Sequence, residues 1–130
     1  MVHWEYALGP LPGGLEWETR RMIIRNVAGK AVFSADKMGK APLAAAARLY
    51  AGLNCFEPGQ EHHAHVHPDQ DKMYVVLEGE GEVVVGEERG RLGPGDLALA
   101  PAGVSHSLRN PGPGRLVVLV VFSPPPATGR

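Results

Sequence analysis

The sequence predicts an all-β domain that closes into one small barrel. Glycine and proline are abundant, at 17 and 12 of the 130 residues, and they separate short apolar segments. About nine or ten short strands in such close succession are typical of a β-sandwich or a barrel. A chain of this length is one domain's worth, and no internal linker divides it.

Three stretches of the chain are expected to differ in structure. Residues 1–18 carry several glycines, prolines and aromatic residues, and we expect an irregular arm that packs on the barrel or on a partner. Residues 19–123 are expected to form the barrel. Residues 124–130 open with three consecutive prolines and are expected to fray.

Within the barrel, strands are expected where apolar segments lie between turn-forming residues. The expected strands include residues 22–27, 31–34, 48–56, 74–77, 82–85, 97–100, 106–109 and 115–122. Residues 36–42 are expected to be a loop, and the alanines at 44–47 fit a helix or a strand. The last strand is almost wholly apolar, so we expect it to be covered on both faces.

The charge balance excludes several classes of partner. The formal net charge is −1 and the basic residues are scattered, which argues against nucleic acid and membrane surfaces. No signal-peptide pattern opens the sequence, and the longest apolar segment, residues 116–122, is shorter than the roughly 18 residues that span a bilayer. The single cysteine, Cys55, rules out an internal disulfide and is expected to be buried and inert. These features predict a cytoplasmic protein.

Histidines gather in one segment of the chain. Four of the six histidines lie between residues 62 and 67. Because side chains alternate along a strand, His63, His65 and His67 are expected to share one face. Neutral imidazoles on one face can bind a single metal ion, and His106, at the start of a later strand, is a candidate third ligand. The alternative is a polar strand face without a metal.

Two segments resemble the two motifs of the cupin superfamily. The first, GQEHHAHVHPDQDKMYVVLEG at residues 59–79, has the glycines and the His-x-His of the first motif. The second, GDLALAPAGVSHSLRN at residues 95–110, has the glycine, Pro-x-Gly, histidine and asparagine of the second motif. The short gap between them resembles that of small single-domain cupins, the cupin 2 type of conserved β-barrel.

The resemblance implies both a fold and a site. The implied fold is the cupin double-stranded β-helix, a jelly-roll-like small barrel that takes a small-molecule ligand in its interior. The implied metal ligands are His65, His67 and His106, which would hold one divalent transition metal, with Zn, Fe, Mn, Ni, Co and Cu all open. Asn110 shares a face with His106 and is expected to support the structure rather than contact the ligand.

One position departs from the family's pattern. Lys72 stands where the family has a metal-binding glutamate, and a protonated lysine cannot ligate a cation. Three alternatives stay open. Asp71 or Gln70 supplies an oxygen ligand instead, or the three histidines bind the metal with water completing the shell, or no metal binds natively.

Lys72 and Tyr74 share a strand face and are candidate catalytic residues. If Lys72 points inward, burial and the charge of a metal lower its pKa, and it can act as a general acid or base or pair with an anionic substrate. If it points to solvent, it is a surface charge. Tyr74 by itself would fill the core.

Two functions of different classes follow from these features. The first is a metal-dependent enzyme, dioxygenase- or isomerase-like, that acts on a small organic molecule. The second is a non-catalytic small-molecule or metal-binding module, which the lysine in place of glutamate favours. The apolar last strand and the aromatic arm further predict a homodimer in which the arm adds a strand to the neighbour's sheet.

Overall fold

The computed structural model describes residues 22–125, so the expected arm at 1–18 and the last five residues of the expected tail lie outside the described residues. Nine strands and one short 3-10 helix, η3, make up this part of the chain. They are η3 (Val27–Lys30), β1 (Gly39–Ala45), β2 (Tyr50–Phe56), β3 (Glu61–His65), β4 (Asp71–Glu78), β5 (Gly81–Val85), β6 (Glu88–Leu92), β7 (Leu97–Ala100), β8 (His106–Arg109) and β9 (Leu116–Ser123). No helix in the described range is long and apolar enough to cross a membrane.

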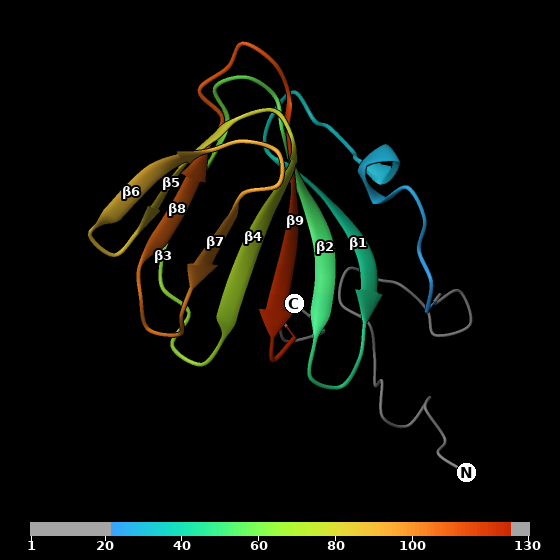
Figure 1. Cartoon of the computed structure of the whole chain (residues 1–130), viewed down its shortest axis with the longest axis vertical. Coiled ribbons are helices and arrows are strands. Elements are labelled where there is room, and N and C mark those ends of the chain that lie inside the picture. The colour runs from blue at the N-terminus through green and yellow to red at the C-terminus, as the bar shows by residue number, and fades with distance from the viewer. Residues whose placement is uncertain (1–21, 126–130) are drawn as a thin grey trace.

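The strands form two antiparallel sheets. A five-stranded sheet has the order β1-β2-β9-β4-β7, and a four-stranded sheet has the order β3-β8-β5-β6. In Figure 1 the four-stranded sheet lies on the left and the five-stranded sheet extends to the right. This arrangement confirms the predicted all-β fold.

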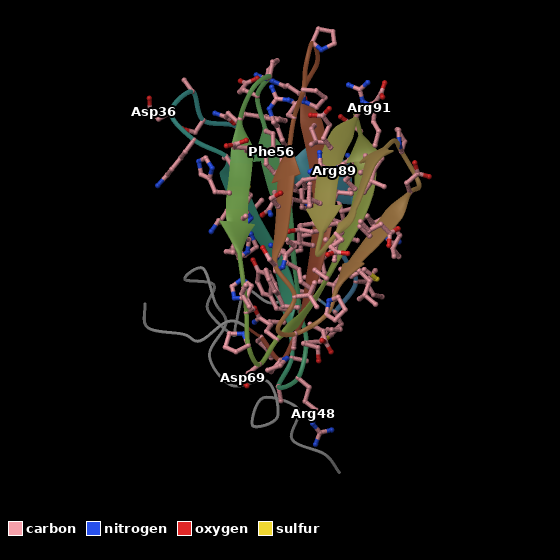
Figure 2. All side chains as sticks on the ribbon, turned by 90° about the vertical axis from the view of Figure 1, so that its left-hand side faces the viewer. Asp36, Arg48, Phe56, Asp69, Arg89 and Arg91 are labelled. Carbon is pink, nitrogen blue, oxygen red and sulfur yellow. The ribbon has the colours of Figure 1, made fainter. Side chains whose placement is uncertain are left out.

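The main hydrophobic core lies between the two sheets. Every second residue of β4 is buried, from Lys72 through Tyr74 to Val76, as strand alternation requires. Phe56 lies among the strands in Figure 2, whereas Asp69 lies at one end of the barrel. The other buried apolar members of this core are Val83, Leu108, Leu116, Val118 and Val120. Burial of these side chains holds the sheets together.

The strands expected at residues 22–27 and 31–34 do not form, and these two predictions are wrong. Residues 27–30 form η3, and residues 31–34 have no strand pairing. Ala31 and Phe33 instead pack on a second apolar cluster on the outer face of the five-stranded sheet. Its buried members are Ala41, Leu53, Cys55 and Val117. The apolar segment at 31–34, which predicted a strand, therefore reflects packing against the outside of a sheet. Cys55 is buried and free, as predicted.

The loop expected at residues 36–42 is wrong for its second half, which belongs to the edge strand β1. Pro42 lies within this strand, and the pairing with β2 slips between Pro42 and Ala44. Proline has no N–H to donate, so sheets tolerate it at edges and bulges. An edge strand that contains a proline is therefore hard to recognise from its sequence.

The apolar strand β9 lies between β2 and β4 in the five-stranded sheet. On its outer face Val117 is buried under the second apolar cluster, whereas Leu119 and Val121 are half-buried. Both faces of β9 are therefore buried at the start of the strand, as expected, but the outer face is only partly buried toward its end.

Asn110 joins the loop after β8 to two neighbouring segments. Its amide nitrogen donates to the carbonyl oxygens of Phe56 at 3.1 Å and Gly114 at 2.9 Å. Its Oδ1 accepts a hydrogen bond from the Gly112 amide at 2.9 Å. The residue is buried, and all three bonds go to the backbone. This arrangement agrees with the expected supporting role.

Asn110→Ala is expected to lower the free energy of unfolding by about 2–4 kcal/mol, because it leaves buried backbone groups unpaired. Urea unfolding followed by circular dichroism measures the change. Arg109→Ala breaks an exposed ion pair with Glu82 and serves as the control, with an expected loss of less than about 1 kcal/mol. A loss for Asn110→Ala no larger than that of the control contradicts the supporting role.

Candidate metal centre

A bulge in β3 brings three histidines together. β3 pairs with β8, and the register shifts between His62 and His65, so that His65 lies opposite His106. The ring centroids are 4.2 Å apart for His65 and His106, 4.7 Å for His65 and His67, and 5.6 Å for His67 and His106. One ring nitrogen from each of these residues lies within 4.8 Å of the others. The three imidazoles could therefore hold a single ion.

The turn before β8 positions His106. Gly103 has a φ of 81°, in the left-handed region that glycine tolerates best, and the Val104 amide donates to the Pro101 carbonyl at 3.1 Å. The Gly103 amide also donates to the carbonyl of His67 at 2.9 Å. This bond joins the turn before β8 to the loop that carries His67. The glycine and proline of the second motif thus place His106 beside His67.

The bulge also changes which histidines face inward. Regular alternation predicted that His63 shares the face of His65, and this prediction is wrong. His63 is exposed, and its Nδ1 pairs with Glu61 Oε1 at 2.7 Å. His62 is turned inward instead, with its ring centroid 4.3 Å from that of His65. Sequence reasoning missed His62 because a bulge places two residues opposite one and breaks the period of two.

Backbone carbonyl groups orient two of the rings. His65 Nδ1 lies 2.7 Å from the carbonyl oxygen of His63, and His106 Nδ1 lies 3.0 Å from that of Val104. A carbonyl oxygen only accepts, so each Nδ1 carries the proton and each Nε2 carries a lone pair. Both Nε2 atoms are buried and have no hydrogen-bond partner. This orientation is the one that metal-binding histidines use.

The surroundings of His67 and His106 favour their neutral forms, which metal binding requires. Burial lowers the pKa of His67, and the nearby charges of His65 and Lys72 lower it further. Burial is also the main cause that lowers the pKa of His106, although its bond to the Val104 carbonyl acts in the opposite direction.

Lys72 points into the barrel and is only 1% exposed. Its Nζ lies 4.8 Å from the ring centroid of Tyr74 and 4.7 Å from that of Phe122. Burial, with a smaller contribution from the charge of Lys40, lowers the pKa of Lys72 to about 7. Of the two orientations left open by the sequence, the inward one is found.

Tyr74 is also buried, and its hydroxyl has no hydrogen-bond partner. Burial raises the pKa of this hydroxyl, so Tyr74 stays protonated and is a donor. Its ring centroid lies 6.2 Å from that of His106. The hydroxyl therefore belongs to the same interior region as the histidines.

The two candidate oxygen ligands, Asp71 and Gln70, make other bonds. Asp71 Oδ1 accepts a hydrogen bond from the Ala102 amide at 2.8 Å, and Gln70 Nε2 donates to the Pro124 carbonyl at 2.8 Å. Asp71 precedes the inward-facing Lys72, so it lies on the opposite face of β4. Because Asp71 is exposed on that face, its carboxylate lies away from the interior, which favours water at the remaining coordination positions.

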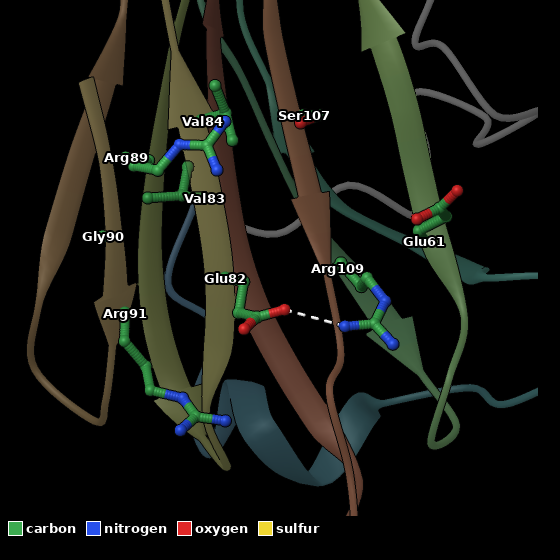
Figure 3. A pocket seen from close by; sticks show the side chains of 9 residues that line it. All are labelled: Glu61, Glu82, Val83, Val84, Arg89, Gly90, Arg91, Ser107 and Arg109. Atoms are coloured by element: carbon green, nitrogen blue, oxygen red, sulfur yellow. Dashed lines mark hydrogen bonds and ion pairs between the residues drawn. The ribbon is translucent and has the colours of Figure 1, made fainter. Parts of the chain in front are cut away.

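A separate cavity of about 380 Å³ lies on the exposed face of the four-stranded sheet (Figure 3). Its lining includes Arg89, Arg91 and Arg109 but none of the three clustered histidines. Arg109 pairs with Glu82 at 2.8 Å, and Arg91 lies 3.6 Å from Glu80. Because these cations are exposed and two of them are paired, the histidine cluster is the stronger candidate for chemistry.

Comparison with known protein families decides the identity of the fold. The family model described as a cupin domain matches residues 52–122, which is more than half of the chain. The chain belongs to the cupin family. The match runs from β2 to β9 and includes all three clustered histidines, and the fold is the double-stranded β-helix of cupins, as the motifs predicted.

Two comparisons support the membership. The crystal structure of TT1209 from Thermus thermophilus is 41% identical, covers 79% of this cupin and 98% of that chain, and has a TM-score of 0.76. An uncharacterized protein of Streptomyces coelicolor is 41% identical over 56 residues, which are 43% of this chain and 52% of the relative. The matches thus span about half the length of the curated relatives.

A second similar structure has a described activity. The crystal structure of a sugar phosphate isomerase from a cupin superfamily, from Silicibacter pomeroyi, is 30% identical, with a TM-score of 0.55. The similarity covers 58% of this cupin and 50% of that chain.

Proposed function

We propose that this cupin holds one divalent transition-metal ion with His65, His67 and His106 and acts as a metal-dependent enzyme on a small organic molecule. The observation that carries the proposal is the pair of buried Nε2 atoms, of His65 and His106, without hydrogen-bond partners. Buried polar atoms in native proteins are almost always paired, and a metal ion would supply the missing partner.

The residues around the cluster suit this role. A bound metal ion would supply Lewis acidity to a substrate oxygen. The rings of Tyr74 and Phe122 help to shield the interior from water. Lys72, with a pKa of about 7, is proposed to exchange a proton with the substrate, and Tyr74 to donate a hydrogen bond to it.

Between isomerase-like and dioxygenase-like chemistry, the first has the better support. The similarity to the sugar phosphate isomerase extends over 58% of the chain. An isomerase that moves a proton between neighbouring carbons needs a group that both accepts and returns it. An amine with a pKa near neutrality meets that requirement.

Metal titration and product analysis test the proposal in two steps. After treatment with a chelator, titration with Zn²⁺ or Co²⁺ is expected to give one bound ion per chain. The loaded protein is then incubated with sugar phosphates, and the products are identified by NMR spectroscopy. Failure to bind either ion rejects the metal centre, whereas binding without conversion of any substrate rejects the isomerase.

A second candidate function is a non-catalytic binding module. It is favoured by Lys72, which stands where cupins have their acidic metal ligand and which would repel a cation. Lys72→Glu is expected to raise the affinity for Zn²⁺ about tenfold or more, because it removes a like charge and adds a ligand. An unchanged affinity would show that this side chain does not reach the ion. A small molecule that binds the wild-type protein and is released unchanged would favour the module.

The protein is further proposed to form a homodimer through the outer face of β4 and β7. Leu97 and Leu99 are 54% and 55% exposed and pair across the strands with Val75 and Met73. None of these four side chains is charged, so a second copy of the same surface is a suitable partner. Sedimentation equilibrium is expected to give a dimer for the wild-type protein and a monomer for Leu99→Glu. A wild-type monomer at micromolar concentration rejects the dimer.

A further inference from the structure

A buried cation lies beside the histidine cluster. Lys72 Nζ is within 5 Å of the ring centroids of Tyr74 and Phe122, at 4.8 and 4.7 Å. The Tyr74 ring centroid lies 6.2 Å from that of His106, and the Phe122 ring centroid lies 6.3 Å from that of His67. The amine therefore occupies the same end of the barrel interior as the candidate metal ligands.

No ion pair among residues 22–125 includes Lys72. The acidic residues next to Lys72 and His62 in the sequence interact with other groups. Asp71 is bonded to the Ala102 amide at 2.8 Å, and Glu61 is paired with the exposed His63 at 2.7 Å. A buried positive charge is costly without an anion beside it.

Two polar atoms near Lys72 lack hydrogen-bond partners. The hydroxyl of Tyr74 is buried without a hydrogen bond, although the residue is 0% exposed. His62 Nδ1 is also buried without a partner, and its ring centroid lies 4.3 Å from that of His65. A hydroxyl and an imidazole N–H both donate hydrogen bonds to anionic oxygens.

We propose that Lys72, Tyr74 and His62 form a subsite that binds an anionic group of the ligand, a carboxylate or a phosphate, next to the metal position. The subsite rests on the proposed function only in that it adjoins the proposed metal centre. None of its three residues is one of the proposed metal ligands. It gives the metal centre a preference for anionic substrates over neutral ones.

Charge supports an anion at this place. Three neutral imidazoles do not compensate a divalent ion, and the ammonium form of Lys72 adds a further positive charge on the same side. In a cupin with glutamate at this position, the protein itself supplies the negative charge. Here a ligand that carries a carboxylate or a phosphate supplies it instead, and it also satisfies the Tyr74 hydroxyl and the His62 nitrogen.

Titration with inorganic phosphate and with acetate tests the subsite and distinguishes the two anions. The protein is loaded with one Zn²⁺ per chain, freed of excess metal and titrated by calorimetry. Lys72→Met is expected to weaken anion binding about 10- to 100-fold, as the loss of a charge-assisted hydrogen bond implies. Tyr74→Phe removes only a hydroxyl and is expected to weaken binding about three- to tenfold.

Each variant is compared with a matched control and with its own metal affinity. Lys37→Met removes an exposed positive charge from the loop before β1 and is expected to leave anion binding unchanged. Lys72→Met and Tyr74→Phe are expected to bind Zn²⁺ at least as tightly as the wild-type protein. Equal anion affinity in Lys72→Met and the wild type overturns the subsite, as does a wild type that binds neither anion at millimolar concentration. If the wild type binds no metal, the metal centre fails, and the same titrations on the metal-free protein decide the subsite.

Discussion

His106→Ala is expected to weaken metal binding by more than about 100-fold. Loss of a partner that only supports a ligand costs roughly 10- to 100-fold in metal affinity, and loss of the ligand itself costs more. His106 is the one member of the cluster supplied by β8, and its buried Nε2 is directed by the bond from Nδ1 to Val104. Competition with a chromophoric chelator measures the Zn²⁺ affinity of the wild type and of the variant.

His63→Ala is the matched control for this experiment. His63 lies in the same segment as the ligands, but it is exposed and paired with Glu61. Its backbone carbonyl, which accepts the bond from His65 Nδ1 at 2.7 Å, remains in the variant. Zn²⁺ affinity is therefore expected to stay within about twofold of the wild type, since this ring is no ligand. Equal affinities for His106→Ala and the wild type would contradict the metal centre.

Lys72→Met is expected to stabilise the metal-free protein at pH 6 by about 3 kcal/mol. Burial lowers the pKa of Lys72 from 10.5 to about 7, and at about 1.4 kcal/mol for each pKa unit this corresponds to about 4–5 kcal/mol of lost stability below pH 7. Methionine has a similar shape and no charge. The variant gives up the attraction between the ammonium and the rings of Tyr74 and Phe122, which is worth about 1–2 kcal/mol.

The advantage of this variant is expected to depend on pH. Between pH 7 and 10.5 the unfolded wild-type chain holds the Lys72 proton and the folded protein has released it, so the contribution of this residue to stability rises with pH. The gain from Lys72→Met should therefore be largest at pH 6 and should disappear as the pH approaches 10. Urea unfolding with a chelator present, at pH 6, 8 and 10, measures it. Lys37→Met is the control, and a gain for Lys72→Met that is independent of pH would contradict the buried amine.

Strands bounded by tight turns were predictable from local sequence. The predicted limits of two strands, 97–100 and 106–109, agree with β7 and β8. Each strand lies between glycine- or proline-containing turns, whose backbone conformations are set by the residues themselves. The segment at 22–34 was not predictable in this way, because Ala31 and Phe33 pack on the outside of a sheet and Met22 and Ile23 are exposed.

The three candidate metal ligands were also predictable, because their spacing in two motifs carries the information. The supporting role of Asn110 followed from the same motifs. His62 was not predictable, since its inward orientation depends on a bulge in the pairing of β3 with β8. No residue in the segment marks that bulge.

The sequence by itself predicted a cupin barrel with His65, His67 and His106 near one point, because the two motifs that carry this resemblance are short local segments. Only the tertiary structure decided the surroundings of that point. It turned His62 inward and His63 outward, and it buried Lys72 between Tyr74 and Phe122. The physical reason is that burial and orientation depend on strand register between distant segments, which no single segment encodes.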